Sequence, residues 1–248
     1  MKKPKSIKKR SELSLNQLLP NLVTIAAICA GLTSIRFGFQ GNYPLAVQLI
    51  LLACILDGVD GRIARLMNSE SALGAELDSL ADFLNFGVAP SLLIYTWAFQ
   101  DIRNEGWIAV VIYVVCCVMR LARFNTASKS EMTGGSKSET TDERRDYFVG
   151  VPAPAGAFLA MLPLFYSFIW GNGPALPSGV IVITTVLAGL LMISRIPTYS
   201  PKSMIIKRAY VKFFMLGFVG VLAAFFSYPW ETLVGLGCFY LVSILWTW

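Results

Sequence analysis

DGVDGRIARLMNSESALGAELDSLAD, residues 57–82, is the stretch of sequence that decides the fold of this chain. It places four aspartates, two arginines and three glycines within or beside apolar sequence that resembles membrane span. A charged side chain near the centre of a bilayer costs at least ~2.5–3.5 kcal/mol on insertion scales, so such groups usually mark a functional site. Carboxylates this close together repel one another unless a cation lies among them. The stretch therefore predicts a divalent metal site in a membrane protein.

The spacing of the acids places them on matching faces of two helices. With ~3.6 residues per turn, each arm of the stretch brings four residues into one arc. The first arc holds Asp57, Asp60, Gly61 and Ala64, with Arg65 at its edge; after a polar break at 68–71, the second holds Gly74, Asp78, Asp82 and Asn85. Two antiparallel helices that meet along these arcs would form a carboxylate pocket. Mg²⁺ or Mn²⁺ would bind there with phosphate oxygens, and the small residues would let a diphosphate approach the backbone.

The same residues satisfy the pattern D-x2-D-G-x2-A-R-x8-G-x3-D-x3-D at every position. In this the chain resembles the CDP-alcohol phosphotransferase family, in which an alcohol attacks the lipid-attached phosphorus of a CDP-linked lipid and CMP leaves. The resemblance implies that Asp57, Asp60 and Asp78 hold Mg²⁺ or Mn²⁺, and that Asp82 is the catalytic base and helps to hold the metal. It also assigns a set of residues to the CDP-lipid, namely Gly61, Ala64, Arg65 and Gly74.

The composition of the 248 residues excludes several classes of protein. Hydrophobic residues make up 55% of the chain and charged residues 15%, with a mean hydropathy of +0.60, which indicates a polytopic membrane protein without a sizeable soluble domain. The net charge is +6, but basic and aromatic residues are not interleaved, so we expect no nucleic-acid partner. The chain contains no histidine. Catalysis must therefore use carboxylates rather than a histidine nucleophile, base or metal ligand.

Eight apolar segments follow one another along the chain, each close to the ~20 residues that cross a bilayer as a helix. They lie at 20–38, 44–66, 79–99, 106–123, 153–170, 178–195, 210–228 and 231–247. The sequence predicts an all-α fold, a polytopic transmembrane helical bundle of about eight spans, and the family resemblance implies a six-helix core plus two. We expect a cytoplasmic basic N-terminus with an interfacial helix at 1–19, and a single transmembrane catalytic domain at 20–248.

Basic residues favour one orientation in the membrane. With the N-terminus in the cytoplasm, all but two of the 21 Lys and Arg residues fall in cytoplasmic loops or near the inner ends of spans; the exceptions are Arg36 and Arg103. Cytoplasmic loops carry an excess of Lys and Arg, so this orientation is the expected one. We therefore predict a multi-pass integral protein of the cell (inner) membrane, with its active site at the cytoplasmic leaflet. Membrane lipid would enter sideways and a soluble substrate from the cytoplasm.

The alcohol that accepts the phosphatidyl group is a further inference. The fourth apolar segment ends in RLARFN, where Arg120, Arg123 and Asn125 provide cationic and amide groups for a carboxylate or phosphate. Together with NFGVAP at 85–90 and GVPAPAG at 150–156, this ending resembles the members of the family that use serine. The resemblance implies CDP-diacylglycerol and L-serine as substrates and a homodimeric assembly.

Two other interpretations remain open from the residues alone. A glycerol phosphate, inositol phosphate or choline acceptor is the alternative within the enzyme class, because arginines also suit a phosphate. Outside that class, intramembrane acids beside small residues could line a cation transporter. A transporter requires charged pathways through several spans, but outside 57–82 the apolar segments carry almost no acids. The sequence therefore favours the transferase.

Overall fold

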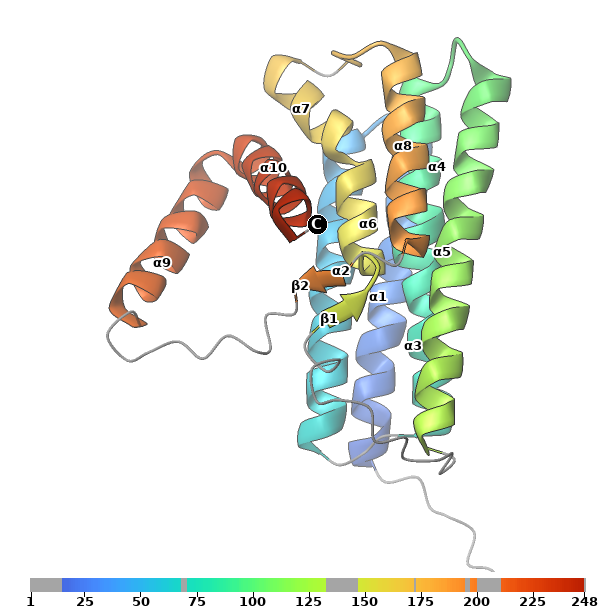
Figure 1. The fold of residues 1–248 in the computed structure, drawn as a ribbon, viewed down its shortest axis with the longest axis vertical. Coiled ribbons are helices and arrows are strands. Elements are labelled where there is room, and N and C mark those ends of the chain that lie inside the picture. Colours follow the sequence, from blue (N-terminus) through green and yellow to red (C-terminus); the bar gives the residue numbers. More distant parts are fainter. Residues whose placement is uncertain are drawn as a thin grey trace, which may run out of the picture.

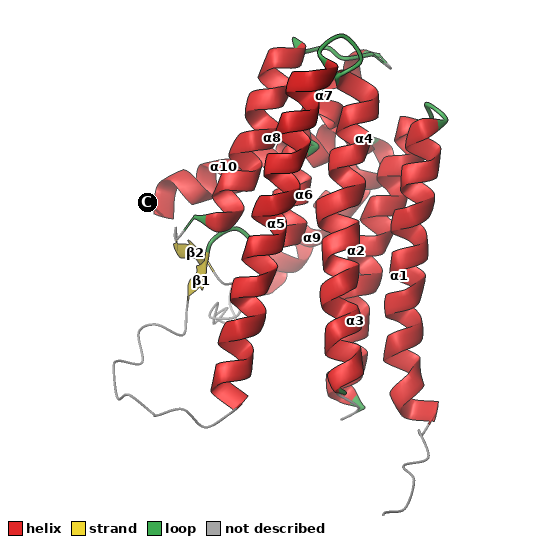
Figure 2. Ribbon diagram, turned by 90° about the vertical axis from the view of Figure 1, so that its right-hand side faces the viewer, coloured by secondary structure: helices red, strands yellow, loops and turns green. Residues whose placement is uncertain are grey.

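The computed structural model describes residues 15–67, 71–132, 147–171, 173–194, 197–199 and 211–247, and they form a bundle of long helices (Figures 1 and 2). The first half contains α1 (Leu15–Phe39), α2 (Tyr43–Leu66), α3 (Ala72–Asp82), the π-helix η1 (Phe83–Val88), α4 (Ala89–Ala98) and α5 (Arg103–Met132). The second half contains β1 (Tyr147–Val149), α6 (Ala153–Ala160), α7 (Leu162–Trp170), α8 (Ser178–Ile193), β2 (Pro197–Tyr199), α9 (Val211–Ser227) and α10 (Pro229–Thr247).

The predicted all-α polytopic bundle is confirmed. Five helical stretches in the described part are long and apolar enough to cross a membrane, and they are Leu18–Phe39, Tyr43–Leu66, Leu73–Ala98, Arg103–Thr126 and Ala153–Trp170. Three shorter apolar helices occupy Ser178–Ile193, Lys212–Ser227 and Pro229–Ile244. Each of the eight predicted segments thus contains helix, and the number that cross the membrane stays a prediction.

The helix ends differ from the expected segment ends in two places. Helix α1 begins at Leu15 and passes without a break through the expected domain boundary at residue 20, while residues 1–14 lie outside the described residues. The division into 1–19 and 20–248 stays a prediction. Helix α5 continues beyond the predicted end at 123 to Met132, although its last turns are polar. Two three-residue strands, which the sequence analysis did not predict, pair antiparallel with Tyr147 opposite Tyr199.

Helix packing brings the two arms of the acidic stretch to one end of the bundle. Helix α1 packs along α2, and α5 packs along α8, while α3 contacts α1 (Figures 1 and 2). Small residues, Ala27 and Ala30 of α1 with Ala53 of α2, are buried between the first two helices. Such residues let helices approach closely in a membrane. Helix α9 extends away from the bundle, and α10 returns to pack on α7 (Figure 1).

A π-turn interrupts the helix that follows the acids. Pro90 lies at the start of α4 and has no N–H, so it cannot donate to the carbonyl of Phe86 as a regular helix requires. The hydroxyl of Tyr113 on α5 donates to this carbonyl at 2.8 Å instead. The Ser91 hydroxyl is within hydrogen-bonding distance of the carbonyl of Gly87 at 2.8 Å. The carbonyls of Phe86 and Gly87 therefore have hydrogen-bonding groups of the protein beside them. Backbone groups that are buried away from water require such partners.

Candidate active site

Helices α2 and α3 carry the acids, and the chain reverses between them. Helix α3 begins after Ser71, whose hydroxyl accepts a hydrogen bond from the N–H of Gly74 at 3.0 Å. A serine at this position satisfies one of the N–H groups that a helix leaves unpaired at its start. The reversal brings Asp78 of α3 opposite Asp57 and Asp60 of α2. The two arcs predicted from the spacing therefore do meet.

Three of the aspartates form a cluster that suits a metal ion. Asp57, Asp60 and Asp78 each offer a carboxylate oxygen, and these atoms all lie within 4.8 Å of one another. Asp60 is only 3% exposed. The Oδ1 atoms of Asp57 and Asp60 are buried without a hydrogen-bond partner among the described residues. A cation would satisfy such buried carboxylate oxygens, and hard oxygen ligands are those that Mg²⁺ and Mn²⁺ prefer. The cluster could hold a divalent metal ion.

Asp82 lies next to the cluster. Its carboxyl group is within hydrogen-bonding reach of Asp57, and it also lies in electrostatic contact with Asp78 and Asp60. The guanidinium of Arg120, on α5, is the cation that acts on Asp82. The fourth predicted acid thus lies beside the other three and interacts electrostatically with Arg120.

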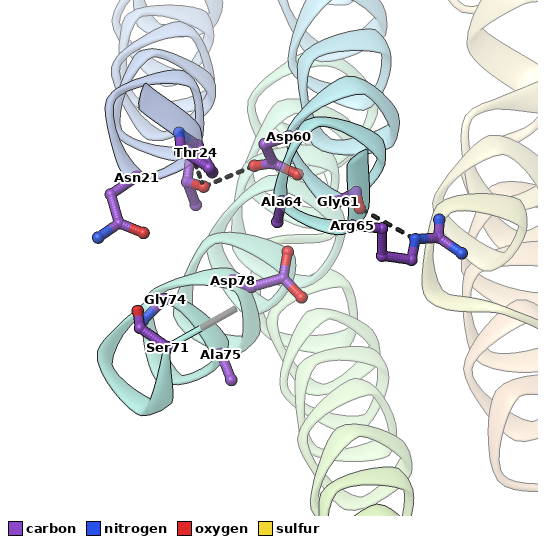
Figure 3. Close-up of a pocket in the computed structure, with 11 residues that line it drawn as sticks. Asn21, Thr24, Asp60, Gly61, Ala64, Arg65, Ser71, Gly74, Ala75 and Asp78 are labelled. Carbon is purple, nitrogen blue, oxygen red and sulfur yellow. Dashed lines mark hydrogen bonds between the residues drawn. The ribbon is translucent and has the colours of Figure 1, made fainter. Parts of the chain in front are cut away.

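A pocket of about 330 Å³ opens beside the acids, as Figure 3 shows. The four residues predicted for the CDP-lipid, namely Gly61, Ala64, Arg65 and Gly74, all line it together with Asp60 and Asp78. The Nε of Arg65 donates to the carbonyl of Gly61 at 3.0 Å, so the side chain folds back along its own helix (Figure 3). The structure therefore brings the predicted residues to one cavity.

Helix α1 supplies part of the pocket wall, which the sequence analysis did not predict. Pro20, Asn21 and Thr24 line the cavity together with Ser71 and Gly74, and Figure 3 shows Asn21 and Thr24 on α1. The Thr24 hydroxyl donates to Oδ2 of Asp60 at 2.6 Å. The sequence did contain a signal for this wall, because Asn21 and Thr24 are polar residues three apart at one end of an otherwise apolar span. Their spacing from the acidic stretch is not fixed by any local rule.

The three residues predicted for serine all lie on α5, but they face different neighbours. Arg120 contacts Asp82 electrostatically. Arg123 donates from Nη1 to the carbonyl of Ile193 at 3.1 Å, at the end of α8. The Asn125 amide donates to the hydroxyl of Ser79 on α3 at 3.0 Å. Arg120 thus interacts by charge with Asp82, one of the four predicted acids.

Tyr240 is a further residue that the sequence analysis missed. It lies on α10, is half-buried against the main core and is in electrostatic contact with Arg120. The C-terminal helix therefore reaches the charged group that acts on Asp82. No spacing pattern could indicate this contact, because Tyr240 and Arg120 are distant in the sequence.

The fold is that of a polytopic membrane protein, and its aspartates form a carboxylate cluster that could hold a divalent metal. A family model described as CDP-alcohol phosphatidyltransferase matches residues 17–194, and a second, CDP-alcohol phosphatidyltransferase 2, matches residues 209–244. The first match covers well over half of the chain. The chain belongs to the CDP-alcohol phosphatidyltransferase family, and the resemblance drawn from the sequence is confirmed.

Curated relatives carry related names. The chain is 43% identical over 189 residues to a CDP-diacylglycerol--serine O-phosphatidyltransferase of Mycobacterium leprae, covering 76% of this chain and 60% of the relative. A protein of the same name from Helicobacter pylori (strain J99) is 38% identical over 183 residues, covering 72% of this chain and 70% of the relative. An archaetidylserine synthase of Methanothermobacter thermautotrophicus is 35% identical over 141 residues, covering 56% and 54%. The chain spans less than two thirds of the length of the mycobacterial relatives.

Proposed function

We propose that this protein transfers a phosphatidyl group from CDP-diacylglycerol to the hydroxyl of L-serine, giving phosphatidylserine and CMP. The observation that carries the proposal is the convergence of Asp57, Asp60 and Asp78 within 4.8 Å beside a pocket that the CDP-lipid residues line. The names of relatives at 38–43% identity support serine as the acceptor.

The acid cluster is the part of the site that would receive the diphosphate. Asp57, Asp60 and Asp78 would hold Mg²⁺ or Mn²⁺, which supplies positive charge to the diphosphate and stabilises the charge that develops in the displacement. Asp60 is already oriented by the Thr24 hydroxyl, so one of its oxygens is fixed and the other stays available. Orientation of a ligand by a neighbouring hydrogen bond is usual in metal sites.

The pocket beside the cluster would bind the CMP portion of the lipid substrate. Gly61 has open space where a side chain would be, and Ala64 has only a methyl group, so this face of α2 admits a bulky charged ligand. Arg65 provides a guanidinium at the rim. The amide of Asn21 and the hydroxyl of Ser71 supply polar groups on the opposite wall. The lipid chains would remain in the bilayer beside the exposed apolar faces of the helices.

Asp82 is the group that we assign as the general base. It would take the proton from the serine hydroxyl while that oxygen forms a bond to the lipid-attached phosphorus. The bond from this phosphorus to the bridging oxygen breaks, and CMP leaves with the electron pair. Since the chain has no histidine, a single in-line displacement is favoured over a phosphohistidine intermediate.

Arg120 is our first choice for the group that binds the serine carboxylate. It interacts electrostatically with Asp82 and does not line the pocket of the CDP-lipid residues, and a guanidinium binds a carboxylate with charge-assisted hydrogen bonds. Arg123 and Asn125 would shape the same region through their contacts with α8 and α3. We further propose a homodimer in the cell (inner) membrane, with the site at the cytoplasmic leaflet.

A second lipid substrate has one supporting observation. The archaetidylserine synthase relative at 35% identity carries a name that refers to an archaeal lipid. The acid cluster and the acceptor site would be the same for a CDP-linked archaeal lipid, since only the hydrocarbon part differs. A direct comparison of the two CDP-lipids as substrates would decide between them.

The first test measures CMP release by purified protein with CDP-diacylglycerol and Mn²⁺, with and without serine. We expect serine-dependent release that EDTA abolishes and that Asp82→Asn lowers by about 100- to 10,000-fold, the usual contribution of a general base. The matched control is Asp101→Asn, an exposed acid in the turn before α5, which should be as active as wild type. Release driven only by glycerol phosphate, inositol phosphate or choline would overturn the serine acceptor. Cation flux without CMP release would support the transporter instead.

A further inference from the structure

A hydrogen bond joins α3 to α5. The amide nitrogen Nδ2 of Asn125 donates to the hydroxyl oxygen of Ser79 at 3.0 Å, and both side chains are half-buried. The Ser79 hydroxyl in turn donates to the carbonyl of Ala75 at 3.0 Å, one turn earlier in α3. A hydroxyl has one donor and also accepts hydrogen bonds, so the two bonds are compatible. The position of the Ser79 oxygen is therefore fixed from both sides.

Ser79 lies among the acids of α3. It directly follows Asp78 and precedes Asp82 by three residues. Residues three apart are neighbours on one face of a helix, whereas adjacent residues point about 100° apart. Ser79 and Asp82 therefore share one face of α3, and Asp78 lies on another.

These two faces of α3 meet different partners. The carboxylate oxygens of Asp78 and of the α2 acids Asp57 and Asp60 lie within 4.8 Å of one another. Asp82 interacts electrostatically with Arg120 of α5. Both contacts depend on how α3 is rotated about its own axis, because a rotation that moves one acid also moves the other.

Helix α5 reaches the face of Ser79 and Asp82 at two levels. Arg120 interacts with Asp82, and Asn125 bonds to Ser79. Asn125 lies about 7.5 Å further along α5 than Arg120, and Ser79 lies about 4.5 Å before Asp82 on α3. Helix α3 packs mainly on α1 rather than on α5, and Figure 2 shows α5 leaving α3 toward the end of the bundle where α3 begins. Side chains, rather than close helix packing, therefore make the connection.

We propose that the Asn125–Ser79 hydrogen bond is a positioning contact that sets the rotation of α3. With that rotation, Asp78 faces the metal cluster while Asp82 faces Arg120. The inference rests on the proposed function, in which Asp78 is a metal ligand and Asp82 the base. Asn125 and Ser79 act through the helix that carries the two acids, as outer residues do around metal ligands. Asn125 thus has a role other than serine binding, which the sequence analysis inferred.

The test is a double-mutant cycle on the full chain, with Ser79→Ala, Asn125→Ala and the combined variant. Each is assayed for turnover with CDP-diacylglycerol and serine, and for Mn²⁺ binding without substrates by electron paramagnetic resonance. We expect each single variant to lower kcat, and Mn²⁺ affinity with it, by about 10- to 100-fold, the usual effect of losing a group that orients a metal ligand. The combined variant should be no worse than the more affected single variant, because both substitutions remove the same bond. The KM for serine should stay as in wild type.

Thr126→Val is the matched control on α5. The Thr126 hydroxyl is exposed and bonds within its own helix, to the carbonyls of Ala122 and Arg123. Its kcat, serine KM and Mn²⁺ affinity should match those of wild type. Thermal unfolding in detergent is measured for every variant, so that a loss of folded protein is not mistaken for a loss of catalysis.

Three outcomes would overturn the inference. Effects of the single variants that multiply in the combined variant would mean that the two residues act independently. A rise in the serine KM for Asn125→Ala alone would make Asn125 a serine ligand. Unchanged Mn²⁺ affinity in the folded variants would mean that Asp78 keeps its place without the bond. Failure of the proposed function has a different sign, because wild type itself would then show no serine-dependent CMP release, while the cycle in Mn²⁺ affinity remains measurable.

Discussion

The hydroxyl of Thr24 and the carboxylate of Asp60 are joined by a hydrogen bond of 2.6 Å between α1 and α2 (Figure 3). Both side chains are buried, at 4% and 3% exposed. The same hydroxyl lies 3.1 Å from the carbonyl of Pro20, one turn earlier in α1, so the position of the oxygen is fixed from two sides. The contact directs one oxygen of Asp60 toward α1 and leaves the other for the acid cluster. The first helix therefore helps to orient the acid cluster, although it contains no acid in its described residues.

Replacing Thr24 with valine tests this relationship. Thr24→Val keeps the shape of the side chain but removes the donor, so Asp60 loses its orientation. We expect Mn²⁺ affinity to fall by about 10- to 100-fold, as for other groups that orient metal ligands. Calorimetric titration with Mn²⁺ measures this effect. Thr33→Val is the control, since the Thr33 hydroxyl is exposed and bonds only to its own helix at Cys29. Equal affinities for the two variants would contradict a role for Thr24 in the metal site.

Gly74 provides the next prediction, because it lies where α1 and α3 approach closely. A Cβ at this position would be 2.9 Å from Oδ1 of Asn21 and 3.1 Å from the hydroxyl of Ser71. Gly74→Ala should push these pocket walls apart and raise the KM for CDP-diacylglycerol, with less effect on the KM for serine. Gly58→Ala on α2 is the matched control, since an added Cβ meets nothing within 4 Å there. A selective rise in the serine KM would instead place Gly74 at the acceptor site.

Tyr240 tests whether the C-terminal helix contributes to catalysis. Tyr240→Phe keeps the ring on the core but removes the hydroxyl that acts on Arg120. If Arg120 binds the serine carboxylate, the loss of this polar neighbour should raise the serine KM. The KM for CDP-diacylglycerol should not change. Tyr228→Phe, at an exposed position before α10, serves as the control. Equal serine KM values for both variants would remove Tyr240 from the acceptor site.

The sequence was sufficient for the acids because their positions depend on local geometry. Asp57 and Asp60 lie three residues apart on one helix, as Asp78 and Asp82 lie four apart on the next, and a tight reversal brings the two helices together. Helical periodicity alone therefore predicts the arcs. The apolar segments likewise predict the helices, since a bilayer requires a minimum length of apolar chain.

Tertiary packing decided what the sequence could not predict. Thr24 meets Asp60, and Tyr240 meets Arg120, only because α1 and α10 pack at particular depths and rotations against their neighbours. Apolar side chains surround a membrane helix on nearly all sides. Their pattern therefore says little about which face of the helix turns toward its neighbours. The π-turn before Pro90 also escaped prediction. The hydroxyl that bonds to its Phe86 carbonyl comes from α5, a different helix.

That hydroxyl belongs to Tyr113, and its removal is the last prediction. Tyr113 is fully buried, and Tyr113→Phe leaves the carbonyl of Phe86 without its donor while the ring continues to fill the core. A buried acceptor that loses its partner costs about 1–3 kcal/mol, so the melting temperature in detergent should fall. Tyr166→Phe, at a partly exposed ring on α7, should melt like wild type. If Tyr113→Phe melts unchanged, the π-turn is held by helix packing alone. If it melts lower and also loses turnover, the π-turn is coupled to the adjacent acids, because Phe86 directly follows Asn85 and Asp82 lies one turn before.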